Sequence, residues 1–268
     1  MTSIPHHADP TRAELRQARV ARRLEHAIAA GGLQVYYQPE ATLHPPMLVS
    51  LEALCRWHDS ELNLVTPDEF IAVAEARGLI IPLGEEIWRL VLNDLPTVLQ
   101  RWPHARVAVN VSGLELAQPD YASKVIAAVQ ARGLHLAQHL ELEVTESVFH
   151  TDPATVKQNL VDLKAQGFTV AIDDFGTGQS SLSRLHTLPF DKIKMDKSFV
   201  QALEDPTARA ILKAMIDLAV SLDKVLVVEG LETPAQSAVL QSLGCQFAQG
   251  YWLSAPQPLA QLLSSLQA

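Results

Sequence analysis

Eight short apolar runs alternate with helical stretches along this 268-residue chain, and this alternation constrains the fold more than any other feature. Strands that alternate with helices favour a parallel sheet, because each helix returns the chain to the start of the next strand. The expected strands occupy residues 33–39, 47–57, 106–112, 140–146, 169–175, 192–196, 224–230 and 247–253. The expected helices occupy residues 67–77, 84–100, 120–132, 153–166, 205–222 and 234–242.

The first two runs are joined only by residues 41–46, which are too few to form a helix. They are therefore expected to form an antiparallel pair. Eight strands in a chain of this length favour an α/β fold of the (β/α)8 type, a TIM-like barrel with an antiparallel first strand pair. Residues 11–30 also have a helical pattern that ends at two glycines. We expect an N-terminal helical extension over residues 1–30 and the barrel over residues 31–268.

Composition narrows the class of protein and of partner. Apolar residues make up 48% of the chain, which is enough for a hydrophobic core. The net charge of −9 disfavours binding to DNA or RNA polymers and to anionic membranes, since both repel an acidic protein. No apolar run reaches the roughly 18 residues of a membrane span, and Cys55 and Cys245 make no disulfide framework. We therefore expect a cytoplasmic location without membrane insertion.

Polar residues gather where the expected strands end. They are Glu52, Asn110, Glu143, Glu146, Asp173, Asp174, Lys194, Asp196, Glu229, Glu232 and Gln249. Any one of them alone is typical of a surface acid or a core hydrogen bond. In a (β/α)8 barrel, however, the carboxyl ends of the strands meet at the face that holds the active site. Burying so many carboxylates together requires cations, and oxygen ligands without His or Cys favour Mg²⁺, Mn²⁺ or Ca²⁺.

Asp173 and Asp174 form the most informative pair. Adjacent carboxylates at a strand end can bridge two cations, and two such ions clamp a phosphoryl group and activate a water molecule. The alternative, that residues 173–178 form only a turn at the entry to a helix, stays open. No Gly-x-Gly-x-x-Gly sequence and no Walker motif is present, which argues against dinucleotide and nucleoside-triphosphate binding.

Several motifs in order carry a family resemblance. They are LEALCRW (51–57), VNVS (109–112), LELEVTES (140–147), AIDDFGTG (171–178), KIKMDKSF (192–199), VVEGLET (227–233) and QGYWLS (249–254). With them the chain resembles the EAL family of bacterial cyclic-di-GMP phosphodiesterases from about residue 33 to residue 258. The resemblance implies a second-messenger hydrolase with a barrel fold that opens cyclic-di-GMP to linear pGpG. It also implies two Mg²⁺ or Mn²⁺ ions, activation of water by these ions, and a homodimer.

The resemblance also implies roles for individual residues. The implied metal ligands are Glu52, Asn110, Glu143, Asp173, Asp174 and Glu229, with Asp173 bridging both ions and Glu229 acting through water. The implied catalytic residues are Lys194, Glu229, Asp174 and Gln249. The implied substrate contacts are Gln38, Leu54 and Arg56, the last to phosphate. Glu146 is implied to anchor the loop at 174–178, and Asp196 and Glu232 to support the site.

Three of these roles concern the attacking water. Lys194 would hold and orient it, Glu229 would be the general base, and Gln249 would donate a hydrogen bond near it. The metal requirement agrees with the charge of the ligand, because cyclic-di-GMP carries about two negative charges and an acidic pocket without cations would repel it. Glu40 departs from the family pattern. It shares the strand face of Gln38, so we predict that it adds negative charge at the barrel mouth and weakens substrate affinity.

Two other functions remain open from the sequence. In the first, the chain is a receptor that binds cyclic-di-GMP without hydrolysing it. In the second, it is a different barrel enzyme, such as a proton abstractor with strand-end acids, Mg²⁺ and a lysine base. Metal-dependent hydrolysis of cyclic-di-GMP separates both from the phosphodiesterase. The dipeptide His58-Asp59 resembles a motif of HD phosphohydrolases, but it follows an expected strand rather than lying on a helix with further ligands.

Overall fold

The computed structural model describes residues 11–145, 148, 152–176 and 188–266. The chain forms two compact units. Unit 1 comprises residues 1–34 and 55–86, and unit 2 comprises residues 35–54 and 87–268. Three elements contribute residues to both units: β1 (Leu33–Thr42), β2 (Leu48–Asp59) and α3 (Ile80–Arg101).

Unit 2 contains a closed barrel. Besides β1 and β2, its strands are β4 (Arg106–Asn110), β5 (Leu140–Thr145), β6 (Thr169–Phe175), β7 (Lys192–Met195), β8 (Val225–Val228) and β9 (Phe247–Gln249). The order of the strands is β1-β9-β8-β7-β6-β5-β4-β2, and pairing of β1 with β2 closes the ring of eight within the described residues. The pairs from β2 through β9 are parallel, whereas β1 is antiparallel to β9. The expected barrel with an antiparallel first strand is confirmed. A two-residue strand, β10 (Gln257–Pro258), pairs with β1 outside this ring.

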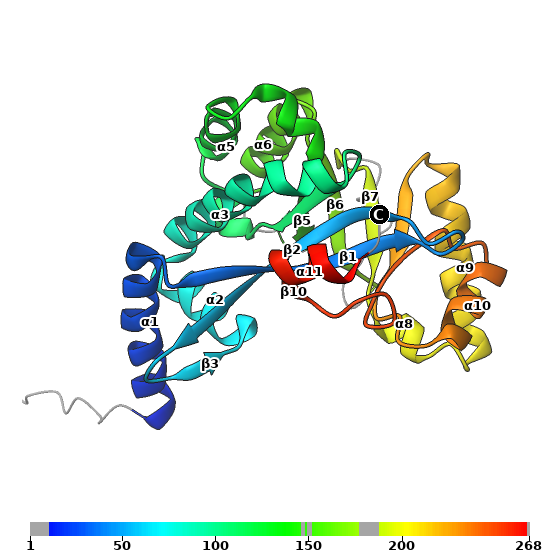
Figure 1. Cartoon of the computed structure of the whole chain (residues 1–268), viewed down its shortest axis with the longest axis horizontal. Coiled ribbons are helices and arrows are strands. Elements are labelled where there is room, and N and C mark those ends of the chain that lie inside the picture. The colour runs from blue at the N-terminus through cyan, green and yellow to red at the C-terminus, as the bar shows by residue number, and fades with distance from the viewer. Residues whose placement is uncertain (1–10, 146–147, 149–151, 177–187, 267–268) are drawn as a thin grey trace, which may run out of the picture. The chain divides into compact units, whose positions relative to one another are not determined.

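Helices cover the outside of the barrel. They are α4 (Gly113–Leu116), α5 (Tyr121–Gln130), α6 (Pro153–Ala165), α8 (Ser198–Gln201), α9 (Pro206–Ser221), α10 (Pro234–Ser242) and α11 (Leu259–Ser265), with a 3-10 helix at Leu134–His139. α5 and α6 lie side by side in Figure 1. The starts of α6, α9 and α10 follow from their sequences, since each has a proline in its first turn and an Asp or Thr side chain that accepts a backbone N–H.

Most expected elements are confirmed with shifted ends. α2 (Pro67–Arg77) and α10 match the expected bounds, whereas α3 begins four residues earlier than expected, at Ile80. Pro82 lies in the first turn of α3, where a helix tolerates proline because the missing N–H has no partner there in any case. The sequence analysis missed β3 (Asn63–Val65), β10, α4, α8 and the 3-10 helix, which are too short for periodicity to reveal.

Alternation along the barrel strands separates an apolar side from a polar side. On β5, Leu142 and Val144 belong to the hydrophobic core, and Glu141 and Glu143 alternate with them. On β7, Ile193 and Met195 belong to the same core, and Lys192 and Lys194 alternate with them. On β1, the buried Tyr37 donates a hydrogen bond of 2.8 Å from its hydroxyl to Asp94 of α3. The interior of the barrel therefore receives charged side chains from successive strands.

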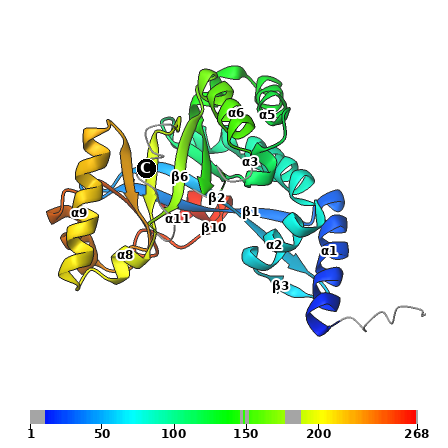
Figure 2. The ribbon, with the colours of Figure 1, turned by 180° about the vertical axis from the view of Figure 1, so that it is seen from behind.

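Charge pairs and the edge-to-face packing of Trp57 on Phe70 join the elements of unit 1. It contains α1 (Arg12–Ala30), which lies beside α2 (Figure 2), and the hairpin of β2 and β3. Arg16 pairs with Glu69 at 2.5 Å, and Arg23 pairs with Asp59 at 2.7 Å. The division of the chain at residue 30 stays a prediction. Among the described residues, no helix combines the length and the apolar character needed to cross a membrane.

Candidate active site

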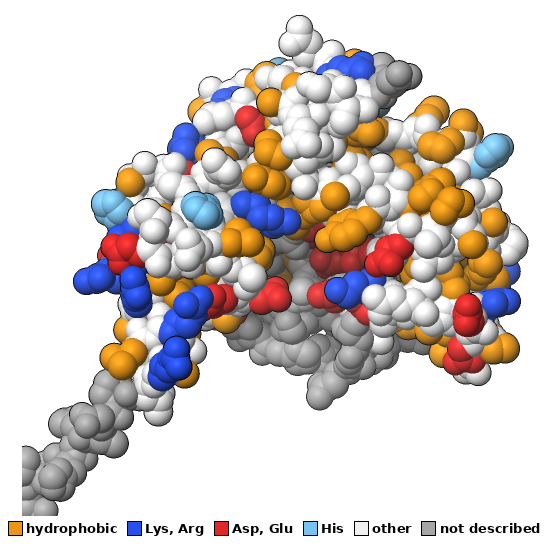
Figure 3. Space-filling view, turned by 60° about the horizontal axis from the view of Figure 1, so that its bottom comes forward, with side chains coloured by type: hydrophobic (Ala, Val, Ile, Leu, Met, Phe, Trp, Pro, Cys, Tyr) orange, Lys and Arg blue, Asp and Glu red, His pale blue; other side chains and the backbone are white. Residues whose placement is uncertain are grey.

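A cleft of about 370 Å³ opens at the carboxyl ends of the unit 2 strands. Buried Glu52 and Gln249 line it together with Asp173 and Glu229, and exposed side chains from the segments after β7, β8 and β9 complete it. Acidic side chains gather where the face drawn in Figure 3 is hollowed. The cleft lies where a (β/α)8 barrel places its active site.

Lys194 of β7 lies at the centre of this site and is fully buried. Its Nζ is 2.7 Å from Oε1 of Glu229 and 2.9 Å from Oε1 of Glu143. Oε2 of Glu52 and Oδ1 of Asp173 lie further away, at 3.4 and 3.6 Å. Burial opposes the charge of Lys194, but Glu143 and the other carboxylates outweigh it and raise the lysine pKa. The cluster carries more negative charge than one lysine can neutralise.

The carboxylates of this cluster are not equivalent. Burial raises the pKa of Glu143 well above its ordinary value, against the attraction of Lys194. Burial likewise raises the pKa of Glu229 to about 7. At Glu52, burial is outweighed by Lys194 and by two amide donors, which lower its pKa. Carboxylates whose pKa values are pushed apart in one cluster are typical of sites that divide acid, base and ligand roles.

Amide side chains from two strands, β4 and β9, fix Glu52. Asn110 donates to Oε1 of Glu52 at 2.8 Å, and Gln249 donates to Oε2 at 2.5 Å. The amide of Gln249 also donates to Oε1 of Gln38 at 3.2 Å, and the amide of Gln38 in turn donates to the backbone oxygen of Ser254. One continuous set of hydrogen bonds therefore links β1, β2, β4 and β9 at the mouth of the barrel.

Asp173 and Asp174 lie together at the end of β6. The register of β6 with β7 shifts between Ile172 and Phe175, and Asp174 has a left-handed φ of 52°. This turn brings adjacent carboxylates to one side of the strand end, as expected. Asp173, Asp174 and Glu229 each offer a carboxylate oxygen, and these atoms lie within 4.8 Å of one another.

The residues present fit a divalent cation. The atoms that could bind a metal ion are carboxylate oxygens, which suit Mg²⁺, Mn²⁺ or Ca²⁺. Among the described residues, both carboxylate oxygens of Glu143 and the Nζ of Lys194 are buried without an aligned hydrogen bond, despite their short ion-pair distances. The protein groups described here thus leave buried oxygens available to a further positive charge.

Most residues expected at the site come together in the structure. Leu54 and Glu232 also line the cleft. Asp196 directly precedes Lys197, which lines the cleft. It accepts a hydrogen bond from the backbone N–H of Ser198, at the start of α8. Arg56 belongs to unit 1, where its guanidinium donates to the backbone oxygen of Cys55, and its expected contact with phosphate stays a prediction. Glu146 and the loop residues 177–178 lie outside the described residues.

The expected position of Glu40 at the mouth of the barrel is wrong, and its effect on substrate affinity stays untested. Its side chain is buried, and both of its carboxylate oxygens accept hydrogen bonds from Nζ of Lys192, at 3.1 and 2.9 Å. Lys192 also donates to Glu141 at 2.7 Å. Sharing a strand face with Gln38 established the direction of the Glu40 side chain but not its depth. Because β1 runs against its neighbours, Glu40 lies deeper in the barrel than Gln38, and its carboxylate shares Lys192 with Glu141 there.

Five residues that line the cleft were not expected from the sequence: Lys197, Gln201, Gly230, Gly250 and Tyr251. They follow the strands at irregular distances, so strand periodicity gives no signal for them. Lys192 and Glu141 carried a detectable signal, because charged residues there alternate with apolar ones inside buried strands.

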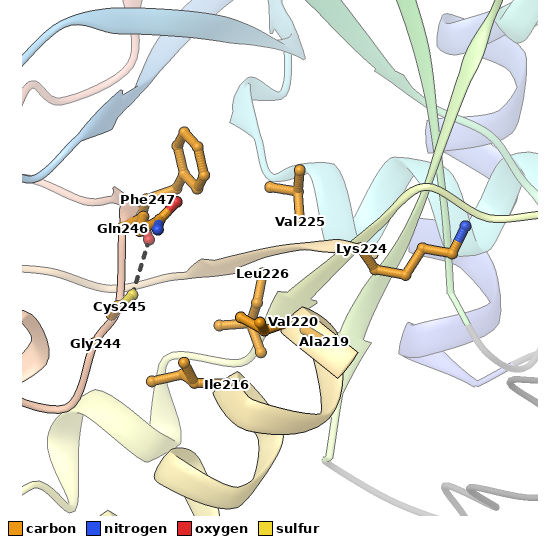
Figure 4. Close-up of a pocket in the computed structure, with 10 residues that line it drawn as sticks. All are labelled: Ile216, Ala219, Val220, Lys224, Val225, Leu226, Gly244, Cys245, Gln246 and Phe247. Atoms are coloured by element: carbon orange, nitrogen blue, oxygen red, sulfur yellow. Dashed lines mark hydrogen bonds between the residues drawn. The ribbon is translucent and has the colours of Figure 1, made fainter. Parts of the chain in front are cut away.

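Another cavity, of about 90 Å³, lies at the amino ends of β8 and β9 (Figure 4). Apolar residues of α9 line much of it, and the thiol of Cys245 donates to the backbone oxygen of Phe247 at 3.2 Å. Burial raises the pKa of Cys245 to about 12, so the thiol keeps its proton. No acidic side chain of the described residues lines this cavity, which leaves the cleft at the carboxyl ends as the candidate active site.

Comparison with known proteins agrees with this architecture. An EAL domain family model matches residues 21–256. The chain is 42% identical to the uncharacterized protein y4lL of Sinorhizobium fredii, covering 96% of this chain and 31% of that protein. It is 37% identical to the bifunctional diguanylate cyclase/cyclic di-GMP phosphodiesterase MucR of Pseudomonas aeruginosa, covering 93% of this chain and 37% of that protein.

A solved structure of the PaMucR phosphodiesterase in complex with c-di-GMP superimposes with a TM-score of 0.85 at 34% identity. The match covers 91% of this chain and 99% of that one. The chain therefore spans about a third of the length of the two curated relatives but nearly all of this solved domain. On the family match and the shared barrel, this chain belongs to the EAL domain family.

Proposed function

We propose that this chain hydrolyses cyclic-di-GMP to linear pGpG with two Mg²⁺ or Mn²⁺ ions. The observation that carries the proposal is the excess of carboxylates around Lys194, with three carboxylate oxygens of Asp173, Asp174 and Glu229 gathered within 4.8 Å. Such a cluster repels an anionic dinucleotide unless cations are present. The relatives named as cyclic di-GMP phosphodiesterases and the c-di-GMP complex of PaMucR support the choice of substrate.

The side chains proposed to hold the ions are Glu52, Asn110, Glu143, Asp173, Asp174 and Glu229. Divalent cations, when bound, lower the pKa of water and neutralise charge on the phosphodiester. Asn110 and Gln249 keep the carboxylate of Glu52 in one orientation through the hydrogen bonds described above. Side chains held in this way do not have to reorient when a metal ion binds.

The chemistry of the reaction assigns the remaining roles. The oxygen of water forms a bond to phosphorus, the bond from phosphorus to the 3′-oxygen breaks, and that oxygen takes up a proton. Glu229, whose carboxylate lies 2.7 Å from Nζ of Lys194, accepts the proton of the water. Lys194 orients the water, and Gln38 and Leu54 contact the dinucleotide from the side of the cleft formed by β1 and β2.

Chromatography of cyclic-di-GMP incubated with the chain and Mg²⁺ or Mn²⁺ tests the proposal. We expect pGpG to form, and a chelator or the variant Glu52→Gln to abolish its formation. The control Asp217→Asn alters an exposed acid on α9 and leaves turnover unchanged. Intact substrate that still binds tightly would make the chain a cyclic-di-GMP receptor. The absence of both binding and turnover would contradict the proposed substrate.

The homodimer implied by the resemblance and the cytoplasmic location expected from the composition stay predictions. Light scattering at micromolar concentration measures the first, and a mass near one chain would contradict it.

A further inference from the structure

The short segment that follows β7 contacts the ends of both neighbouring strands. β7 lies between β6 and β8 in the barrel. The three carboxylates gathered within 4.8 Å come from these two neighbours, because Asp173 and Asp174 lie near the end of β6 and Glu229 directly follows β8. The position of the segment after β7 therefore bears on how the two parts of this carboxylate group are held.

On the β6 side, the contact is made by the ring of Phe199 in α8. Gly176 follows Asp174 by two residues and has a left-handed φ of 100°. A Cβ placed on Gly176 would lie 2.6 Å from Cε2 and 2.9 Å from Cζ of Phe199, so the ring lies directly against the glycine backbone. Phe199 itself packs against the hydrophobic core, which limits the movement of its ring. The turn that carries Asp174 is therefore supported from behind by Phe199.

On the β8 side, the contact is made by Lys197. Gly230 directly follows Glu229 and has a left-handed φ of 75°. A Cβ placed on Gly230 would lie 2.4 Å from the Cβ and 3.1 Å from the Cα of Lys197. Both atoms belong to the base of the lysine side chain, so no rotation of that side chain would relieve the overlap. The backbone next to Glu229 thus lies directly against the backbone of the segment after β7.

Hydrogen bonds and burial fix the piece of chain between the two contacts. The backbone N–H of Ser198 donates to Oδ1 of Asp196 at 3.0 Å, and the backbone N–H of Phe199 donates to the backbone oxygen of Asp196 at 3.1 Å. Val200, the next residue, is buried in the hydrophobic core. Lys197 and Phe199 are therefore parts of one ordered turn, and this turn contacts the backbone beside the carboxylates of β6 and the backbone beside Glu229.

We propose that Lys197 and Phe199 form a brace that sets the separation between the carboxylates of β6 and the carboxylate of Glu229. The inference rests on the proposed function, because it concerns the cations of that site. The two residues are positioning residues, which act through Gly176 and Gly230. A fixed separation matters most for Mg²⁺, which requires near-ideal octahedral geometry and short ligand distances, whereas Ca²⁺ accepts longer distances and irregular geometry. The brace therefore favours Mg²⁺ over Ca²⁺.

Calorimetric titration of the chain with Mg²⁺ and with Ca²⁺, in the absence of substrate, tests the brace. Phe199→Leu keeps an apolar side chain but removes the ring atoms that lie against Gly176. We expect its dissociation constant for Mg²⁺ to rise about 10- to 100-fold, the usual loss when a residue that orients a metal ligand is changed. Its dissociation constant for Ca²⁺ should rise much less. Gly176→Ala and Gly230→Ala should show the same difference between the two ions, because each adds a Cβ that overlaps with the brace.

Gly244→Ala is the matched control for the two glycine variants. Gly244 has a left-handed φ of 88°, but a Cβ placed there would meet no atom within 4 Å. The variant therefore introduces the same kind of backbone strain without a contact to the brace, and both of its dissociation constants should be unchanged.

Thermal unfolding without metal ions establishes which variants fold, and the folded ones decide the outcome. Equal losses for Mg²⁺ and Ca²⁺, or unchanged constants for both, would overturn the brace. Failure of all three variants to fold while Gly244→Ala folds would also overturn it, in favour of a purely structural role. An unaltered chain that binds neither ion contradicts the proposed function and the brace together. A wrong variant pattern in a chain that binds Mg²⁺ and hydrolyses cyclic-di-GMP contradicts the brace alone.

Discussion

Two buried lysines on β7, Lys192 and Lys194, occupy the same barrel interior in different electrostatic surroundings. Lys192 faces two carboxylates, Glu40 and Glu141, and donates well-formed hydrogen bonds to both. Lys194 faces four carboxylates and has no aligned hydrogen bond among the described residues. In the deeper cluster every side-chain polar atom except Oε2 of Glu141 has a hydrogen-bond partner, and one lysine faces two carboxylates, whereas the cluster at the mouth keeps a larger excess of carboxylates over its one lysine. This difference separates a structural ion cluster from one that is open to ligands.

The first prediction removes the lysine of the open cluster. Lys194→Met should lower turnover of cyclic-di-GMP by about 10² to 10⁴-fold, the range expected for a group that acts on the transferred proton or water. Initial rates at saturating Mn²⁺ measure this. Glu204→Gln serves as the control, and a loss below tenfold would show that Lys194 does not act on the water.

The second prediction removes the lysine of the satisfied cluster. Lys192→Met leaves two buried carboxylates unpaired and should lower the free energy of unfolding by about 3–5 kcal/mol. Turnover per folded molecule should persist, because Lys192 does not line the cleft. Urea denaturation together with active-site titration measures both quantities. A loss of turnover without a loss of stability would contradict the structural role.

The third prediction adds cations to the open cluster. Mn²⁺ at about 100 times its dissociation constant should raise the free energy of unfolding by about 2.7 kcal/mol. Asp173→Asn should remove most of this gain, whereas Glu40→Gln should preserve it. Thermal unfolding at a series of Mn²⁺ concentrations measures the gain, and an equal response of both variants would show that the cations bind elsewhere.

The smallest effect is expected when the satisfied cluster is replaced as a whole. The triple variant Glu40→Leu, Lys192→Met, Glu141→Leu removes all three charges together. Its stability should be within about 1 kcal/mol of the unaltered chain or above it, because apolar residues often replace a buried ion cluster without loss. Stability as low as that of Lys192→Met alone would mean that the cluster specifies packing that apolar side chains cannot supply.

The barrel and the mouth of the site could be predicted because both depend on periodicity. Glu143 and Lys194 alternate with apolar residues on strands whose carboxyl ends must meet. The depth of Glu40 does not follow from parity, which gives only the face of β1, but it does follow from the antiparallel direction expected for this strand, which places Glu40 further from the mouth than Gln38. The approach of Lys197 to Gly230 was inaccessible, since it depends on loop backbones rather than on spacing.

The hydrogen bond from Tyr37 to Asp94 has a consequence for strand register. Tyr37 and Gln38 are neighbours on opposite faces of β1, so the bond on the outside fixes which residues point inward. A slip of one residue would turn Tyr37 into the barrel and move Gln38 and Glu40 to the helix side. One hydroxyl on the outer face thus helps to keep both charge clusters of the interior in alignment.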